Sequence, residues 1–223
     1  MTVKEKLEIK SIAKKRIGIF GGAFDPIHYG HTIPTQEIIE AHQLDKVHFV
    51  PTNIPTSSKK IIASSTDRID MMKICLNDVN SIIDAREISR GGISYMIDTI
   101  ESIKKDYTNA NLYLLIGIDV LQNINLWKSF DKIIKTCNII VSSRSHKSID
   151  YVKDINKNSQ LHPLISTDRT IFHSDSYGKI YLEETSMVNT SSTEIRDKLG
   201  YKQSVRGLIS PQLEKWLSKH KIY

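Results

Sequence analysis

Cysteine and long apolar runs are scarce in this 223-residue chain. The two cysteines, Cys75 and Cys137, lie far apart in the sequence, so we expect reduced core thiols and no disulfide framework. No apolar run approaches the roughly 20 residues that span a bilayer. Residues 1–15 are charged throughout and lack the apolar segment of a secretory signal. These absences predict a cytoplasmic protein without a membrane partner.

A dense basic stripe with interleaved aromatic residues is also missing, although the formal net charge is +6 and the isoelectric point is about 9.1. The lysines are scattered among isoleucines and asparagines, and a positive surface also attracts anionic nucleotides. We therefore expect no nucleic-acid partner. The alternative that the charge raises is a non-catalytic nucleotide- or RNA-binding protein, whose RNA affinity would depend strongly on salt.

Alternating strand-like and helix-like segments indicate the fold class. Strand-like apolar runs occupy 16–20, 46–51, 81–85, 111–117 and 137–142. Helical spacing recurs between them, over 31–42, 67–77, 94–105 and 129–135. This order predicts an α/β fold, a doubly wound, Rossmann-like parallel sheet with helices on both faces and a small C-terminal helical portion. We expect a single domain over 16–223, preceded by an N-terminal extension, 1–15.

The most informative segment is 21–31, Gly-Gly-Ala-Phe-Asp-Pro-Ile-His-Tyr-Gly-His, which lies between a strand-like run and a helical pattern. Two glycines at a strand end let backbone N–H groups approach an anion closely, and the positive end of the next helix points to the same place. His28 and His31 are three residues apart, so both imidazoles project from one face of a helical turn. Together these features indicate a site for nucleotide phosphates.

Each part of that segment also has a simpler explanation. A glycine pair after a strand is often only a tight turn. Two histidines at this spacing suit zinc, but no Cys or His cluster supplies the remaining ligands, so we expect no metal held by the protein. A second segment, 191–196, reads Ser-Ser-Thr-Glu-Ile-Arg. Alone it is typical of a capped helix with a surface arginine, yet a hydroxyl cap, free N–H groups and an arginine also suit an anion.

The two segments together resemble the signatures of the nucleotidyltransferases that carry an H-x-G-H motif, here His28-Tyr29-Gly30-His31. From about residue 17 to 223 the chain is most similar to bacterial nicotinate-nucleotide adenylyltransferases. The likeness is also carried by Arg-Gly-Gly-Ile-Ser-Tyr at 90–95 and by 98–99, 115–119, 127, 178–182 and 205–223. The resemblance implies adenylyl transfer from ATP, with Mg²⁺ on the ATP phosphates, to nicotinate mononucleotide. A homodimer is compatible with the sequence, which does not fix the assembly.

The resemblance also implies the roles of individual residues. The expected catalytic residues, which contact the ATP phosphates and stabilise the transition state, are His28, His31 and Arg196. The expected ATP-binding residues are Gly21, Gly22, Ala23, Phe24, Gly30, Ser192, Thr193 and Arg196. The expected acceptor-binding residues are Ser94, Tyr95, Met96, Gly117, Asp119, Trp127 and Arg144. From the residues alone, the alternatives are a helix cap for Asp119 and a core side chain for Trp127.

Three features on the acceptor side depart from the usual family pattern, namely Met96, Lys128 and the loop 55–60, where Lys59 or Lys60 stands in for a basic contact. They concern the preference for the acid over the amide, so nicotinamide mononucleotide is the nearest alternative acceptor and phosphopantetheine a more distant one. The remaining histidines show no convergent partners in the sequence, and we expect structural or solvated roles for His42, His48, His146, His162, His173 and His220.

Overall fold

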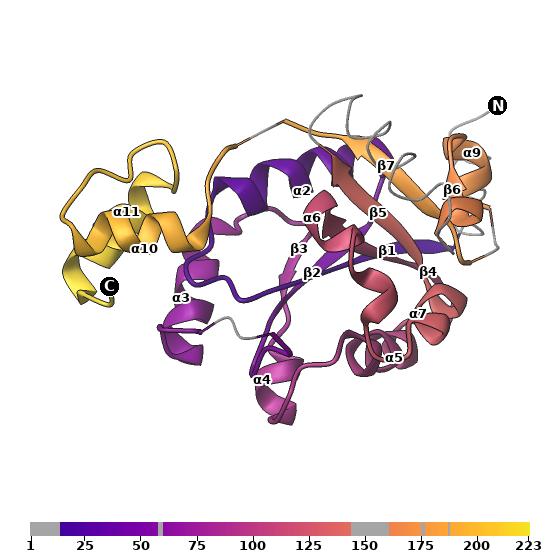
Figure 1. The fold of residues 1–223 in the computed structure, drawn as a ribbon, viewed down its shortest axis with the longest axis horizontal. Coiled ribbons are helices and arrows are strands. Elements are labelled where there is room, and N and C mark those ends of the chain that lie inside the picture. The colour runs from indigo at the N-terminus through magenta and orange to yellow at the C-terminus, as the bar shows by residue number, and fades with distance from the viewer. Residues whose placement is uncertain (1–13, 58–59, 144–160, 175–176, 187) are drawn as a thin grey trace.

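The computed structural model describes residues 14–57, 60–143, 161–174, 177–186 and 188–223. In this part of the chain, seven parallel strands form one sheet in the order β3-β2-β1-β4-β5-β7-β6 (Figure 1). Their bounds are β1 Lys15–Gly22, β2 Lys46–Pro51, β3 Ser81–Ile83, β4 Ala110–Gly117, β5 Asn138–Ser143, β6 Ile165–Ser166 and β7 Ile180–Glu184. The parallel α/β prediction is confirmed.

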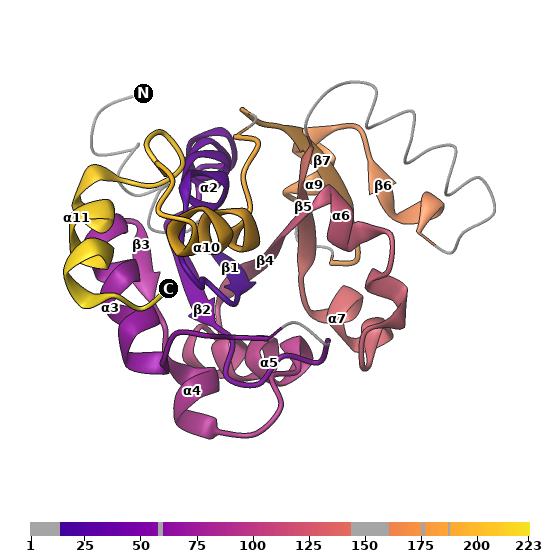
Figure 2. The ribbon, with the colours of Figure 1, turned by 60° about the vertical axis from the view of Figure 1, so that its left-hand side comes forward.

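Helices cover both faces of the sheet (Figure 2). On one face pack α5 Met96–Asp106, α6 Ile118–Leu121 and α7 Phe130–Thr136. On the other pack α2 Tyr29–His42, α3 Ser65–Cys75, α9 Arg169–Phe172, α10 Ser192–Gly200 and α11 Pro211–His220. The short elements α4 Arg86–Arg90, η1 Ile124–Leu126 and η2 His162–Leu164 complete the described set. The predicted C-terminal helical portion corresponds to α10 and α11.

The central strands form because their side chains are apolar on both faces. Every residue of β4 except Gly117 is buried, as expected for a parallel strand that is covered by helices on both sides. On α5, the isoleucines at 97, 100 and 103 share one face and are all buried against the sheet. Burial of these two elements together supplies much of the core on the α5 face.

The strand order places the functional edge of the sheet. The chain moves outward from β1 through β2 to β3 and then returns to the other side of β1 with β4. In sheets of this kind, ligands bind beyond the carboxyl ends of the strands at such a reversal. Gly22 ends β1 and Gly117 ends β4, so the reversal lies beside the glycine turn that the sequence singled out.

The sequence located five of the seven strands and missed β6 and β7. β6 has only two residues, too few for a periodic pattern, and β7 follows polar chain. β1 begins at Lys15, one residue earlier than the predicted domain boundary, and 1–13 lie outside the described residues. Among the described helices, none is long and apolar enough to cross a membrane.

Candidate active site

The turn from β1 into α2 brings two imidazoles into contact. His28 is the N-cap residue of α2 and is 6% exposed, and the ring centroids of His28 and His31 are 3.7 Å apart. The backbone N–H of His28 donates to Nδ1 of His31 at 3.3 Å. In a neutral His31 this bond keeps the proton on Nε2. A Cβ at Gly30 would lie 3.0 Å from the His28 ring, so a glycine here lets the imidazole pack against the helix.

Burial controls the charge of His28. Burial lowers the pKa of His28 to about 4, so the free protein holds this ring uncharged at neutral pH. Its buried Nδ1 has no hydrogen-bond partner among the described residues. A phosphate beside the ring would favour the protonated form, because an opposite charge raises the pKa of an imidazole.

The second motif packs directly on the first. Ser191 is the N-cap of α10, since its side-chain oxygen accepts the N–H of Glu194 at 3.1 Å. Ser192 begins the helix, and its hydroxyl donates to the carbonyl of Pro26 at 2.9 Å. Arg196 donates to the carbonyl of Asp25 at 2.7 Å and to the hydroxyl of Thr193 at 3.2 Å. The two predicted phosphate-binding segments are therefore joined by hydrogen bonds.

Asp25 lies at the centre of that junction and is 1% exposed. Its carboxylate accepts the backbone N–H groups of Ile62 and Ala63 at 2.7 and 3.0 Å and the hydroxyl of Tyr223 at 2.7 Å. One Arg196 nitrogen lies 3.8 Å from the carboxylate. The pKa of Tyr223 is raised, first by burial and then by its bond to Asp25.

A buried arginine completes this arrangement. Arg68 is 2% exposed and donates to the carbonyl of Ala23 at 2.7 Å, while its charge interacts with that of Asp25. We refer to Asp25, Arg68, Arg196 and Tyr223 as the Asp25 cluster. The cluster brings the C-terminus next to α3 and α10 (Figure 2). Sequence reasoning assigned no role to Asp25 or Tyr223, although Asp25 stands inside the most informative segment.

A cavity of about 550 Å³ opens beside the same glycine turn, on the side of α5. It is lined by Gly21, Gly22, Thr52, Pro55, Thr56, Ser57, Glu87, Ser94, Tyr95, Met96, Leu126, Trp127, Lys128 and Ile133. Two glycines predicted for ATP and four residues predicted for the acceptor therefore share one wall. We refer to this space as the acceptor cavity.

Hydrogen bonds hold the mouth of the acceptor cavity in shape. The N–H of Asn53 donates to the Ser94 hydroxyl at 2.9 Å, and the N–H of Ser94 donates to the carbonyl of Ile54 at 2.8 Å. Tyr95 caps α5 without a side-chain bond to the helix. Its ring lies 4.0 Å from Nζ of Lys128. Trp127 is half-buried at the end of η1.

Other predicted acceptor residues lie elsewhere. Gly117 and Asp119 are not among the residues that line the acceptor cavity, and Asp119 is exposed in the first turn of α6. Arg144 lies outside the described residues, as does Lys59. Glu87 was missed by sequence reasoning. Its carboxylate, in a side chain that is 2% exposed, accepts the hydroxyl of Thr99 at 2.6 Å, and no motif marked it.

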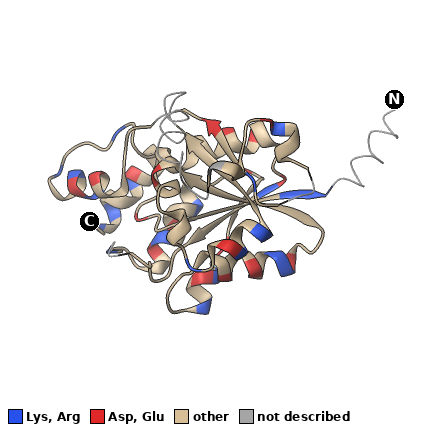
Figure 3. Ribbon diagram, turned by 45° about the vertical axis from the view of Figure 1, so that its right-hand side comes forward, with Lys and Arg blue, Asp and Glu red and all other residues tan. Residues whose placement is uncertain are grey.

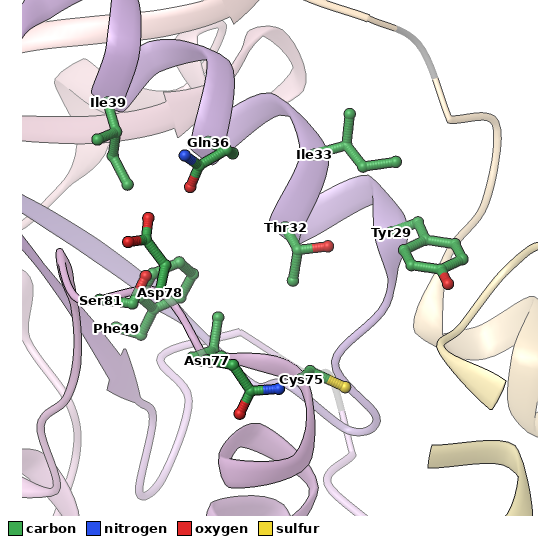
Figure 4. Close-up of a pocket in the computed structure, with 11 residues that line it drawn as sticks. Tyr29, Thr32, Ile33, Gln36, Ile39, Phe49, Cys75, Asn77, Asp78 and Ser81 are labelled. Carbon is green, nitrogen blue, oxygen red and sulfur yellow. The ribbon is translucent and has the colours of Figure 1, made fainter. Parts of the chain in front are cut away.

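A smaller cavity, of about 240 Å³, lies between α2 and the segment from α3 to β3 (Figure 4). Tyr29, Thr32 and Gln36 reach it from α2, and Asn77 and Asp78 from the opposite side. None of the predicted site residues lines it. The helix that carries the two motif histidines thus has a second, separate concave surface.

Three of the other histidines have hydrogen-bond partners that the sequence did not reveal, and these partners are consistent with the structural roles expected for them. His42 is fully buried, with its ring nitrogens 3.1 Å from Nε2 of His173 and 2.8 Å from the carboxylate of Glu183. His48 lies 2.7 Å from the carboxylate of Asp84. Each pair joins segments that are distant in sequence, so periodicity could not reveal it.

Charged side chains of both signs are interspersed in the described part of the chain, and both cysteines are free. Lys and Arg alternate with Asp and Glu along the helices that face the viewer in Figure 3. Cys75 and Cys137 are free thiols, and burial raises the pKa of Cys137 to about 12. In the part of the chain that the structure describes, no three His, Cys, Asp or Glu side chains gather as metal ligands would.

Known proteins resemble this chain in sequence and in fold. The family described as cytidylyltransferase-like matches residues 19–198. Probable nicotinate-nucleotide adenylyltransferases of Psychromonas ingrahamii and Dictyoglomus turgidum are 32% and 34% identical, over 95% and 93% of this chain and 99% and 95% of theirs. The solved Plasmodium falciparum nicotinic acid mononucleotide adenylyltransferase, complexed with NaAD, superposes with a TM-score of 0.69 at 20% identity. The superposition covers 93% of this chain and 96% of that structure, and it supports the fold.

Proposed function

This chain belongs to the cytidylyltransferase-like family, within which its relatives are nicotinate-nucleotide adenylyltransferases, and from that premise we propose the reaction of its cleft. The enzyme transfers the adenylyl group of ATP to nicotinate mononucleotide, which gives nicotinic acid adenine dinucleotide and pyrophosphate and serves NAD biosynthesis. Residues 16–223 act as one nucleotidyltransferase domain, with 1–15 as an extension.

The reaction needs alignment and charge stabilisation more than proton transfer. An oxygen of the mononucleotide phosphate attacks the α-phosphorus of ATP, and the bond between the α-phosphorus and the bridging oxygen to the β-phosphate breaks. The nucleophile is already an anion at neutral pH, so no general base is required. Donors and cations that are fixed before substrate binds lower the barrier, because they meet the charge that develops on the α-phosphate.

The residues of the glycine turn match that demand. His31 carries its proton on Nε2 in the neutral ring, so it donates to a phosphate oxygen, and the buried His28 becomes a better donor as the anion favours its protonated form. Backbone N–H groups of Gly22, Ala23 and Phe24 and the N-terminus of α2 complete the ATP site. Gly30 leaves room for the adenosine. ATP enters as its complex with a divalent metal, which we propose is Mg²⁺.

The second motif serves the distal phosphates. Ser192, Thr193 and Arg196 stand at the N-terminal end of α10, where N–H groups and a guanidinium together favour an anion. Arg196 is bonded to the Asp25 carbonyl in the free protein, so it is held beside the first motif. We assign this end to the β- and γ-phosphates of ATP.

The acceptor cavity takes the mononucleotide. Trp127 offers its face to the pyridine ring, and the backbone N–H groups of Tyr95 and Met96 face the carboxylate from the start of α5. Ser94 frames the same end of the cavity, with its own N–H bonded to the carbonyl of Ile54. We propose that Gly117 and Asp119 lie beside the acceptor outside this wall, with the Asp119 carboxylate on a ribose hydroxyl, and that Arg144 contacts the adenosine or phosphate side of the substrates. The single observation that carries the assignment is that the second phosphate motif and the cavity meet along one turn of the first motif, where Gly21 and Gly22 line the cavity and Pro26 is bonded to Ser192.

Pyrophosphate release from ATP and Mg²⁺ tests the function, with nicotinate mononucleotide in one reaction and nicotinamide mononucleotide in a parallel one. We expect turnover with the acid and a much larger kcat/KM for the acid than for the amide. Equal values would overturn the acid as the specific acceptor and define a dual-specificity enzyme. Absence of turnover with both would overturn the proposed reaction and leave only the nucleotidyltransferase fold.

A further inference from the structure

The acceptor cavity has one cation among the described residues that line it, Lys128. Its side chain follows Trp127 directly and is 51% exposed. An exposed lysine normally extends into water, where its ammonium is strongly hydrated. Here Nζ lies instead 4.0 Å from the centroid of the Tyr95 ring and 4.0 Å from the carboxylate of Asp98. The ammonium is therefore held over the start of α5.

The start of α5 is itself electropositive. The helix has 11 residues, and its cap residue Tyr95 makes no side-chain bond to the free N–H groups of the first turn. Asp98 in that turn offsets part of this field and also attracts Lys128. A second anion at the mouth of the cavity would thus meet two favourable partners, the helix end and the lysine.

Glu87, the only acid among the described residues that line the cavity, is much more buried than Lys128. Glu87 is 2% exposed and bonded to Thr99, whereas Lys128 is half-exposed on a flexible stem. A ligand that carries both charges suits this pair of groups, because a pyridinium ring is positive and its carboxylate negative. Lys128 is the group that can follow the ligand, since a lysine moves its ammonium by several ångströms through rotamer changes alone.

We propose that Lys128 sets the preference for the acid over the amide by pairing its ammonium with the pyridine carboxylate of the acceptor. This inference rests on the proposed function. The amide lacks the negative charge, so its carbonyl oxygen gains only a weaker hydrogen bond from Lys128, and its NH₂ group faces a lysine and a helix end that are themselves donors. The discrimination comes from unpaired donors around the amide and not from the size of the cavity.

The phosphate of the mononucleotide is the other anion that Lys128 could bind, and kcat/KM values for the two acceptors distinguish the two cases. The phosphate is common to the acid and the amide, so a lysine that bound it would change kcat/KM for both acceptors equally. A lysine that binds the carboxylate changes the value for the acid alone. The ratio of the two values therefore reports which anion is paired.

The test measures kcat/KM for nicotinate and nicotinamide mononucleotides with Lys128→Gln, Lys128→Arg and the matched control Lys132→Gln, an exposed lysine on α7. Lys128→Gln should lower the acid-to-amide ratio about tenfold through a higher KM for the acid, the size of one charge-assisted hydrogen bond that is partly exposed. Lys128→Arg should keep most of the preference, and Lys132→Gln all of it. Thermal melting of each variant checks that the fold is unchanged.

The outcomes distinguish the two proposals. Wild-type turnover with an unchanged ratio in Lys128→Gln would overturn the role of Lys128 and leave the reaction standing. A parallel fall for both acceptors would also overturn it, in favour of the phosphate. A wild-type protein that turns over neither acceptor would overturn the reaction, and the inference about Lys128 with it.

Discussion

The two sides of the cleft that meet at Gly21-Gly22 are built in different ways. On the proposed ATP side, the Asp25 cluster and the bond from Ser192 to Pro26 join segments around residues 25, 62, 196 and 223 through partly buried hydrogen bonds. On the acceptor side, a cavity of about 550 Å³ is lined by groups that stay partly exposed, among them Trp127 and Lys128. The proposed ATP side is thus fixed by its own hydrogen bonds, as charge stabilisation requires, whereas residues of the proposed acceptor side can be replaced at little expected cost to folding.

The largest expected effect falls on the ATP side, at His31. We expect His31→Ala to lower kcat at least ~100-fold, the scale of removing one preorganised donor from a developing charge. The variant keeps the fold, because His31 is half-buried and alanine favours a helix. Pyrophosphate release at saturating substrates measures the change.

His220→Ala is the matched control for that variant, since His220 is exposed at the end of α11. Its kcat should remain within twofold of wild type. Near-normal turnover of a folded His31→Ala protein would remove His31 from the transition state and would weaken the contrast between the two sides.

The second expected effect tests whether the ATP side depends on the Asp25 cluster for stability. Asp25→Asn keeps the shape of the side chain and removes the charge that faces Arg68 and Arg196. We expect the free energy of unfolding to fall by about 2 kcal/mol, as for a buried hydrogen-bonded charge, and urea denaturation measures it. Tyr223→Phe, which removes one donor, should cost about 1 kcal/mol.

Asp45→Asn serves as its control. Asp45 accepts a backbone N–H of Arg16 at 2.8 Å but is exposed, so the same chemical change should cost less than about 1 kcal/mol there. Equal losses at the two aspartates would show that the cluster adds no stability of its own.

The sequence foresaw one side of the cleft much better than the other. The glycine turn on the proposed ATP side is contiguous in sequence, so the pattern of glycines at a strand end and histidines three apart predicted that the two imidazoles lie close together. The sequence did not identify Ser191 as the cap of α10, because a run of hydroxyl residues does not show where a helix begins. The partners of Asp25 at 62–63, 196 and 223 were invisible, since no local pattern links residues so far apart.

The acceptor side shows the same limit more strongly. Its wall is assembled from five separate segments, around residues 21, 55, 87, 95 and 127, and those around 55 and 87 carried no signal that predicted a place in the wall. Asp119 follows a strand end as predicted, yet it does not line the cavity. The sequence could not predict this, because the composition of α6 does not determine the direction in which the helix leaves the sheet. The order of strands and helices could therefore be predicted from the sequence, whereas the side chains that meet in the cavity depend on how those elements pack.

The smallest expected effect is also the one that divides the cleft most directly. Trp127→Ala should raise the KM for nicotinate mononucleotide about tenfold, within the range for losing one ring from a stack, and leave the KM for ATP unchanged.

Arg196→Ala should show the converse, a higher KM for ATP with a nearly constant KM for the acceptor. Initial rates with each substrate varied in turn give both constants for both variants. If Arg196→Ala moved only the acceptor constant, the assignment of the two sides would be wrong. If both variants moved both constants, the glycine turn would couple the two sides, and the organised and the open halves would act as one site.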